Sequence, residues 1–407
     1  MKKIFLSCFL ISLNWGNISY AENLIDLYKS GVKNSPNFKA FEIKNTALDF
    51  NNKSIEKNRF INFNTELKRN IFNSFNELSS GENIIFNANF DLFYKKKPEI
   101  EKNILEIEKN LSLLTLEKKD LFIKITDLYF EYIKYKKLLE VHKKNLDWVI
   151  KNIFIVEKGI EGGIYPSNEI FRWKIEKYKQ ENILENDNLQ LKLILEDLKK
   201  ITFLDNIKIT EELKSKNIFS LEAILKNDPQ QKITNLSNSQ VEKEIEIEKN
   251  YWYPEFKLSN EYNFSRNITI KEPNFNNNLN MSLSINLYFN ILDGGKEDKI
   301  ASLGKNIELN NIEFLKYNQE LKNTVNLKLL EIESQNKQIN NAKNIIEVSE
   351  TNLSKLLIGY HKKFIDLNTL ITSYKENLVL QEDYINLSVN LEKNKEILYH
   401  LSSGDIY

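Results

Sequence analysis

The stretch that decides the fold is residues 283–295, which read LSINLYFNILDGG. Along it, apolar side chains alternate with polar ones: Leu283, Ile285, Leu287, Phe289 and Ile291 against Ser282, Ser284, Asn286 and Asn290. A period of two over about ten residues predicts a β-strand with one apolar and one polar face, as in a membrane-spanning β-barrel. A soluble sheet packed on a helix shows the same alternation, so the strand alone leaves both readings open.

The same pattern occurs once more, in residues 84–94. Here one face carries Ile84, Phe86, Ala88, Phe90, Leu92 and Tyr94, and the other carries Asn83, Asn87, Asn89 and Asp91. The two stretches match at an offset of 197 residues, and Asn34-Ser35-Pro36 recurs as Asn227-Asp228-Pro229 after 193 residues. This internal repeat predicts two copies of one unit, over residues 22–205 and 206–403, followed by a short tail at 404–407.

Each copy is expected to contain a β-hairpin, because a weaker alternation precedes each of the two strands. We therefore predict four strands per chain. The apolar positions that should face lipid are Phe86, Phe90, Leu92, Leu283, Leu287 and Phe289. Phe90 and Leu287 are expected near the centre of their strands. Tyr251, Trp252 and Tyr253 come just before the second hairpin, where amphipathic rings suit a membrane interface or pack against helices.

Long helices account for most of the remaining sequence. From Ile104 to Val156 the apolar residues recur in heptads, and only Lys118 and His142 interrupt the seam. Such a pattern predicts a coiled-coil helix from Pro98 to about Lys158, on the order of 90 Å long. The second copy repeats it more loosely. Pro36, Pro98, Pro166 and Pro229 stand where helices are expected to begin.

The first 21 residues read as a secretory signal peptide. Lys2 and Lys3 precede an apolar run, and cleavage is expected after Ala21. A lipoprotein reading has to use Cys8, the single cysteine, but only four residues separate it from Lys3. Formal charge is balanced, with 57 acidic and 57 basic residues, which removes the usual argument for a nucleic-acid partner.

Four strands cannot close a barrel, because the smallest membrane barrels have about eight. Open strand edges are not tolerated in hydrocarbon, so several chains must share one barrel. The long helices then continue from one end of it. The sequence therefore predicts an α+β membrane protein, mostly long coiled-coil α-helices forming a tube, with four strands per chain in a shared barrel.

These residues resemble the TolC-like outer membrane efflux family over nearly the whole mature chain. The resemblance rests on Asn34-Ser35-Pro36, on Tyr253-Pro254-Glu255-Phe256 entering a strand, and on the strand that ends at Asp293-Gly294-Gly295. It implies a homotrimeric channel in the outer membrane, a helical tube in the periplasm, and docking to an inner membrane transporter through a periplasmic adaptor. Neither catalysis nor a metal or cofactor is expected, because the three histidines lie far apart in the sequence and no His/Cys or carboxylate cluster has metal-ligand spacing. A periplasmic coiled-coil adaptor or scaffold is the alternative.

By this resemblance, the turns that join each long helix to the next form the periplasmic tip. These turns contain Gly159, Gly162 and Gly163 in the first copy and Gly359 in the second. Glu169 and Asp366 match at an offset of 197 and are candidates for an acidic gate. The alternative is that each carboxylate only caps the helix that follows.

Overall fold

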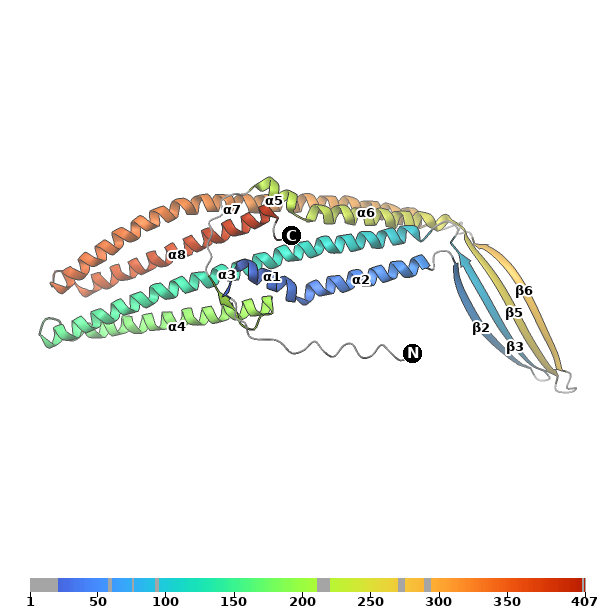
Figure 1. Cartoon of the computed structure of the whole chain (residues 1–407), viewed down its shortest axis with the longest axis horizontal. Helices are drawn as coiled ribbons and strands as arrows, with labels where there is room; N and C mark the ends of the chain where they lie inside the picture. Colours follow the sequence, from blue (N-terminus) through green and yellow to red (C-terminus); the bar gives the residue numbers. More distant parts are fainter. Residues whose placement is uncertain are drawn as a thin grey trace. The chain divides into compact units, whose positions relative to one another are not determined.

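The computed structural model describes residues 21–57, 61–74, 77–91, 95–210, 220–269, 275–288, 294–404 and 406. The expected signal peptide, Leu92 and Phe289 lie outside these residues, apart from Ala21. The chain is mostly helical with one small antiparallel sheet, which confirms the predicted fold class at that level (Figure 1).

Two similar sets of elements follow one another along the chain. The first is α1 (Leu24–Asn34), α2 (Pro36–Lys57), β2 (Ile61–Ser74), β3 (Glu77–Phe90), α3 (Lys97–Glu161) and α4 (Glu169–Thr202). The second is α5 (Leu221–Asn227), α6 (Gln230–Lys249), the 3-10 helix η1 (Asn250–Trp252), β5 (Glu255–Thr269), β6 (Phe275–Tyr288), α7 (Lys296–His361) and α8 (Leu367–Ser403). A short parallel pair joins β1 (Ala21–Glu22) to β4 (Lys208–Ile209).

The chain divides into two compact units that each combine both sets. A sheet unit contains residues from Lys39–Thr115 and Pro229–Gln319. A helical unit contains the described residues up to Phe38 together with those in Leu116–Asp228 and Glu320–Tyr407. The boundaries at residues 205 and 403 stay a prediction, because these units group residues of both repeats.

In the sheet unit the four strands are all antiparallel, in the order β2-β3-β5-β6 (Figure 1). β3 begins at Glu77 and ends at Phe90, whereas the sequence pattern placed this strand over residues 84–94. Just after the strand, the carboxylate of Asp91 accepts hydrogen bonds from the backbone N–H groups of Lys95 and Lys96, at 2.9 and 3.2 Å. α3 begins at the next residue, Lys97.

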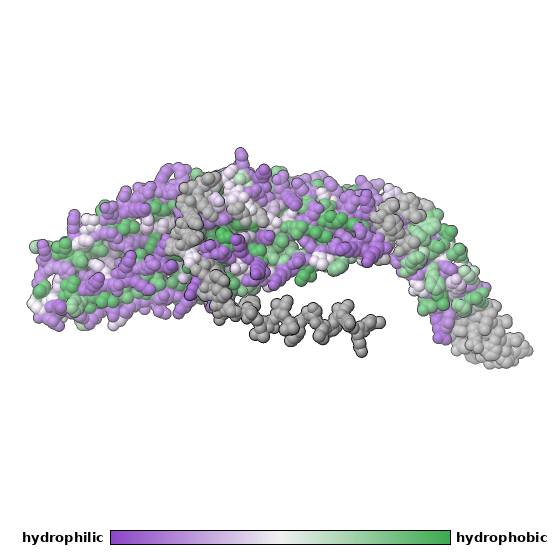
Figure 2. All heavy atoms as spheres, viewed as in Figure 1, coloured by the Kyte–Doolittle hydropathy of each residue, from purple (hydrophilic) through white to green (hydrophobic). Residues whose placement is uncertain are grey.

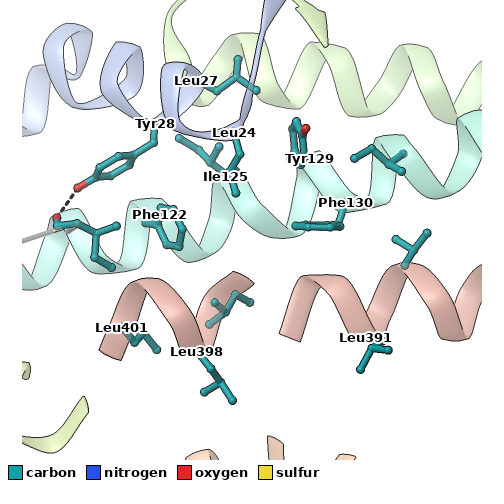
Figure 3. Packing of buried hydrophobic residues seen from close by; sticks show 14 of the residues in the cluster. Leu24, Leu27, Tyr28, Phe122, Ile125, Tyr129, Phe130, Leu391, Leu398 and Leu401 are labelled. Atoms are coloured by element: carbon teal, nitrogen blue, oxygen red, sulfur yellow. Dashed lines mark hydrogen bonds between the residues drawn. The ribbon is translucent and has the colours of Figure 1, made fainter. Parts of the chain in front are cut away.

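The helical unit has a core to which all its helices contribute. Leu27 of α1, Phe122 and Ile125 of α3, and Leu398 of α8 are fully buried there (Figure 3). Each such side chain contributes about 1.5–3 kcal/mol by leaving water. The Tyr28 hydroxyl donates to the carbonyl of Ile406 at 2.6 Å, which joins Ile406 to this core.

The predicted heptad helix is confirmed as α3, one uninterrupted helix of 65 residues. Its middle buries a second stripe beside the expected seam, formed by Phe122, Thr126, Tyr129 and Ile133. The spacing of four, three and four residues places these side chains on one side of the helix. α3 therefore packs against several neighbours. None of the helices in the described residues is both long enough and apolar enough to span a membrane.

Candidate functional site

The four strands of the sheet unit form a sheet with one mainly apolar and one mainly polar face. Because paired residues share a face, the register assembles the apolar face in rows: Phe90, Phe256 and Leu287; Phe63, Ala88, Leu258 and Ile285; Phe86 and Leu283; Leu67, Ile84, Tyr262 and Met281; Phe264 and Leu279. Aromatic rings contact one another across β3 and β5: Phe90 and Phe256 within one row, with centroids 5.5 Å apart, and Phe86 and Tyr262 in adjacent rows, with centroids 6.0 Å apart.

Much of this apolar face is uncovered. Phe63 is 76% exposed, Leu283 67% and Ile285 64%, far more than side chains of a closed core. Figure 2 shows apolar side chains over the described part of the sheet. Monomeric soluble proteins rarely expose a continuous apolar surface of this kind, so this face is a site of contact with something apolar.

The described residues among those expected to face lipid all lie on this apolar face. Two of them, however, are not in the central part of their strands. Phe86, Leu283 and Leu287 are exposed. Phe90 is the last residue of β3 and Leu287 the last but one of β6, so both lie at the end of the sheet nearest the helices. The expectation that they are central is wrong. β3 begins seven residues before the alternating pattern at residue 84, and β6 begins eight residues before the pattern at residue 283, so both strands continue further away from the helices than predicted. The row of Phe86 and Leu283 is more central.

The opposite face carries mainly Asn and Ser, with a few charges that have partners. The Ser259 hydroxyl donates to Asn87 Oδ1 at 2.8 Å, and Asn83 donates to Glu261 at 3.4 Å. Polar residues also lie on the apolar face: Thr65 shares the row of Phe86 and Leu283, and Arg69 and Glu82, an ion pair at 3.5 Å, share the row of Phe264 and Leu279. The sequence pattern also missed Asn260, which lies in the row of Phe86 and Leu283 and whose Oδ1 is buried with no hydrogen bond. The weaker alternation of β5 was its only signal.

The expected girdle residues stand where the second hairpin begins. Trp252 ends η1 and is 47% exposed, and Tyr253, 46% exposed, precedes β5 by two residues. The side chain of Tyr251 lies outside the described part. Two half-exposed rings just before the first residue of β5 would suit a boundary between apolar and aqueous surroundings. Their role as interface aromatics stays a prediction.

The turns at the other ends of the long helices belong to the helical unit, and they repeat one backbone pattern. The Gly159 carbonyl accepts from Ile164 and Tyr165 at 2.6 and 3.3 Å. The Gly359 carbonyl accepts from Phe364 and Ile365 at 2.8 and 3.4 Å. The equivalent residues are 200 apart, not 197. By this register Glu169 corresponds to Thr369 and Asp366 to Pro166, so the two acids are not equivalent.

Three of the four glycines of these turns have a structural reason, and the reason differs between them. A Cβ atom on Gly159 would lie 2.2 Å from the Tyr165 ring, and one on Gly359 would lie 2.7 Å from Ile365 Cγ1. Gly163 adopts a left-handed φ of 69°, which glycine adopts without strain. Its equivalent is Lys363, with φ 63°. At Gly162 the nearest atom is 3.6 Å away, so that position has room for a side chain.

The two candidate gate acids make different contacts. Asp366 is the N-cap of α8, and its carboxylate accepts from the backbone N–H groups of Asn368 and Thr369 and from the Thr369 hydroxyl, which is 2.6 Å away. The bond from that hydroxyl is the main reason its pKa is lowered. Glu169, the first residue of α4, accepts a hydrogen bond from the hydroxyl of Tyr360 at the end of α7.

Further contacts join the first turn to the second. The Tyr165 and Tyr360 rings stack with centroids 5.3 Å apart. The Tyr165 hydroxyl is hydrogen-bonded to His361 Nδ1 at 2.8 Å. Burial raises the pKa of both tyrosines, and the charge of Glu169 adds to this effect. Burial lowers the pKa of His361. The sequence places these residues beside the turn glycines but contains no signal that they meet.

No protein-family model and no curated protein matches the sequence. Solved structures are similar in fold. The outer-membrane channel OprN is 11% identical, with a TM-score of 0.76 over 94% of this chain and 89% of that one. VceC of Vibrio cholerae is 13% identical, with a TM-score of 0.74 over 94% and 97%. The CmeC outer membrane channel of Campylobacter jejuni is 13% identical, with a TM-score of 0.69 over 97% and 90%.

At such low identity the similarity establishes the fold. The similarity covers both the sheet and the long helical hairpins, since nearly the whole chain is matched in each case. The chain therefore has the fold of these outer-membrane channels, which confirms, at the level of structure, the resemblance to the TolC-like outer membrane efflux family that its sequence indicates.

Proposed function

We propose that three copies of this chain form an outer-membrane channel, the passive exit duct of a tripartite efflux or type I secretion system. The strands would lie in outer membrane lipid and the helices would extend into the periplasm. A periplasmic adaptor and an inner membrane transporter are the expected partners. The observation that carries the proposal is the sheet, whose apolar face is exposed and whose other face is lined with Asn and Ser.

The edges of the sheet support assembly with other copies. β2 and β6 are the outer strands, so each has one side without a strand partner in the described part of the chain. In hydrocarbon, unpaired backbone groups cost several kcal/mol each, on the order of the cost of burying a lone amide. Three copies would bring 12 strands together, enough to pair every edge and close a barrel around the polar faces.

The long helix α7 also has surface that one copy leaves uncovered. Ile312 is 63% exposed, Leu315 67%, Leu327 61%, Leu330 62% and Val348 69%. Apolar side chains repeated along one helix favour contact with another helix. Neighbouring copies in a trimer would supply such helices. This surface supports a tube of helices made from several chains.

A periplasmic adaptor or scaffold is the competing function, since it would also need an export signal and long helices. It would have no use for an exposed apolar sheet. Extraction of membranes with alkaline carbonate separates the two: the channel should stay in the membrane fraction and have the mass of three chains in detergent. Release into the soluble fraction, or a stable monomer with full β content, would contradict the proposal.

We further propose that the contacts between the two turns form the periplasmic gate. Glu169 is the centre of this proposal, because its bond to Tyr360 ties α4 of one hairpin to α7 of the other. Single-channel recordings test it. Tyr360→Phe and Glu169→Gln should each raise open probability or conductance, whereas Asp366→Asn, which keeps a side chain able to cap, should not. Unchanged currents in all three folded variants would leave Glu169 a structural role only.

A further inference from the structure

His142 lies at the position where the heptad seam of α3 is interrupted, and it is 3% exposed. Its ring lies between two carboxylates. Nδ1 is 2.5 Å from Asp187 Oδ2 in α4, and Nε2 is 2.9 Å from Glu382 Oε1 in α8. α3 and α4 form one helical hairpin, and α8 belongs to the other. This one side chain therefore joins three helices of the helical unit.

Both bonds can form together only when the imidazole is protonated. A carboxylate accepts hydrogen bonds, and a neutral imidazole has one N–H donor and one lone pair. The neutral ring would therefore present its lone pair to Asp187 or to Glu382. In the described part of the chain neither carboxylate has another hydrogen-bond partner. Loss of the proton consequently leaves one carboxylate without its donor, and Asp187 is 3% exposed.

The surroundings favour the charged ring. Burial alone lowers the pKa of His142, but the hydrogen bonds to Glu382 and Asp187, with their charges, outweigh this effect and raise it. A raised pKa means that the contact stabilises the fold fully below the ordinary histidine value of about 6.5 and loses this contribution as pH rises through the folded value.

Other titratable groups lie near this cluster on each packed helix. Burial raises the pKa of the hydroxyls of Tyr135 in α3 and Tyr374 in α8, so both stay neutral. The negative charge of Asp187 adds to this effect at Tyr135, and that of Glu382 adds to it at Tyr374. α7 contributes charged groups to the groove beside Val141 and Asn145, namely Lys343, Glu347 and Glu350. None of these groups is a hydrogen-bond partner of the imidazole, whose two nitrogens are both occupied.

Further polar contacts, which involve no histidine, hold α8 to the first hairpin. Lys375 of α8 pairs with Glu176 of α4 at 3.2 Å, and Lys393 pairs with Asp127 of α3 at 3.1 Å. Histidine is the side chain whose charge ordinarily changes near neutral pH, and His142 is the histidine among these contacts.

We propose that His142, Asp187 and Glu382 form a proton-dependent latch that holds α8 against the α3–α4 hairpin when the ring is protonated and loosens it when the proton leaves. In the channel, the latch makes separation of the two hairpins easier at alkaline than at acidic pH. This effect on the channel rests on the function proposed above. The stimulus is a proton, and the moving element is α8.

Hydrogen exchange of the full-length protein in detergent tests the latch without reference to transport. After correction for the intrinsic pH dependence of exchange, peptides from α8 around Glu382 should exchange faster at pH 9 than at pH 6. The ratio should be about tenfold for each unit by which the pKa of His142 is raised. Glu382→Gln should remove most of this change, because an amide can accept from or donate to Nε2 and so fits either form of the ring.

His400→Gln is the matched control. His400 also lies in α8 and bonds Glu396 within that helix, so its replacement should leave the pH step around Glu382 in place. Absence of a step in the unaltered protein, or an equal step in Glu382→Gln, would overturn the latch. Single-channel recordings at the same two pH values test whether the latch affects channel opening. If the exchange step is present but opening does not change with pH, the latch stands and its link to the channel is refuted.

Discussion

Leu283 offers the sharpest test of the membrane assignment, because it lies in the middle row of the apolar face and is 67% exposed. We expect Leu283→Arg to destabilise the assembled protein by about 2–4 kcal/mol per chain, the cost of an arginine facing lipid near the midplane of a barrel. Ser284→Arg is the matched control. It places the same charge at the same depth, on the polar face shared with Ser259 and Asn87.

The structure also predicts how this cost falls with depth. Leu287 lies four residues from Leu283 in β6, about 13 Å along the strand at ~3.3 Å per residue. A strand tilt of about 40° reduces this to roughly 10 Å of depth, close to the edge of an apolar band about 25 Å tall. Leu287→Arg should therefore cost only about 0–1 kcal/mol.

Urea titration of protein refolded into lipid vesicles measures these differences. The midpoint should fall most for Leu283→Arg, slightly for Leu287→Arg and least for Ser284→Arg. Equal midpoints for Leu283→Arg and Ser284→Arg would show that the face carrying Leu283 does not meet lipid. A larger loss for Leu287→Arg than for Leu283→Arg would instead refute the assigned depth.

Two further predictions concern the turns of the helical unit. Gly159→Ala forces a Cβ atom to within 2.2 Å of the Tyr165 ring, and we expect a loss of about 1–3 kcal/mol in thermal or urea unfolding, while Gly162→Ala, with room around it, should have almost none. Asp366→Ala should increase hydrogen exchange in the first turn of α8. The pKa of Asp366 is lowered in the folded protein, so its capping contributes fully above the pKa of the unfolded chain and is lost as pH falls through the pKa of the folded protein. Hydrogen exchange in this turn should therefore become equal in wild type and Asp366→Ala at acidic pH.

The long helices and the strand faces could be predicted because each follows from a simple repeat. A heptad pattern fixed α3 to within a few residues at each end, and the alternation in β6 placed Leu283 and Leu287 on one face. Proline was equally informative: Pro36 is the first residue of α2 and Pro98 the second of α3. Heptads, alternation and proline are local signals, and they predict these elements because local backbone geometry determines where helices begin and which face of a strand a side chain occupies.

The register between the two turns could not be found in this way. The predicted offset of 197 and the observed 200 differ by three residues, which is close to one helical turn of about 3.6 residues. Both alignments therefore place similar side chains on similar helix faces, and apolar periodicity cannot choose between them. The choice depends on backbone hydrogen bonds around Gly159 and Gly359, and it decides whether Glu169 and Asp366 are equivalent.

Buried charges were equally hard to predict, because their partners are distant in sequence. The seam pattern singled out Lys118, but the neighbouring Lys119 is the buried one, at 2.5 Å from Asp228. His142 was recognised as an interruption of the seam. Its two partners were not, since they lie 45 and 240 residues away in other helices. A single sequence shows which residue breaks a pattern, and packing decides what it meets.

The polar contacts of α8 also explain how its register against α4 is fixed. Asn368, Lys375 and Glu382 are spaced by one heptad, and they meet Arg172, Glu176 and the His142–Asp187 pair. A slip of α8 by one heptad would keep apolar residues opposite apolar ones, so packing alone opposes it weakly. The same slip would bring Lys375 opposite Arg172 and Glu382 opposite Glu176, whose side chain is only 5% exposed. Like charges at such short range are costly where water is excluded, so these contacts select one register even though each adds little net stability.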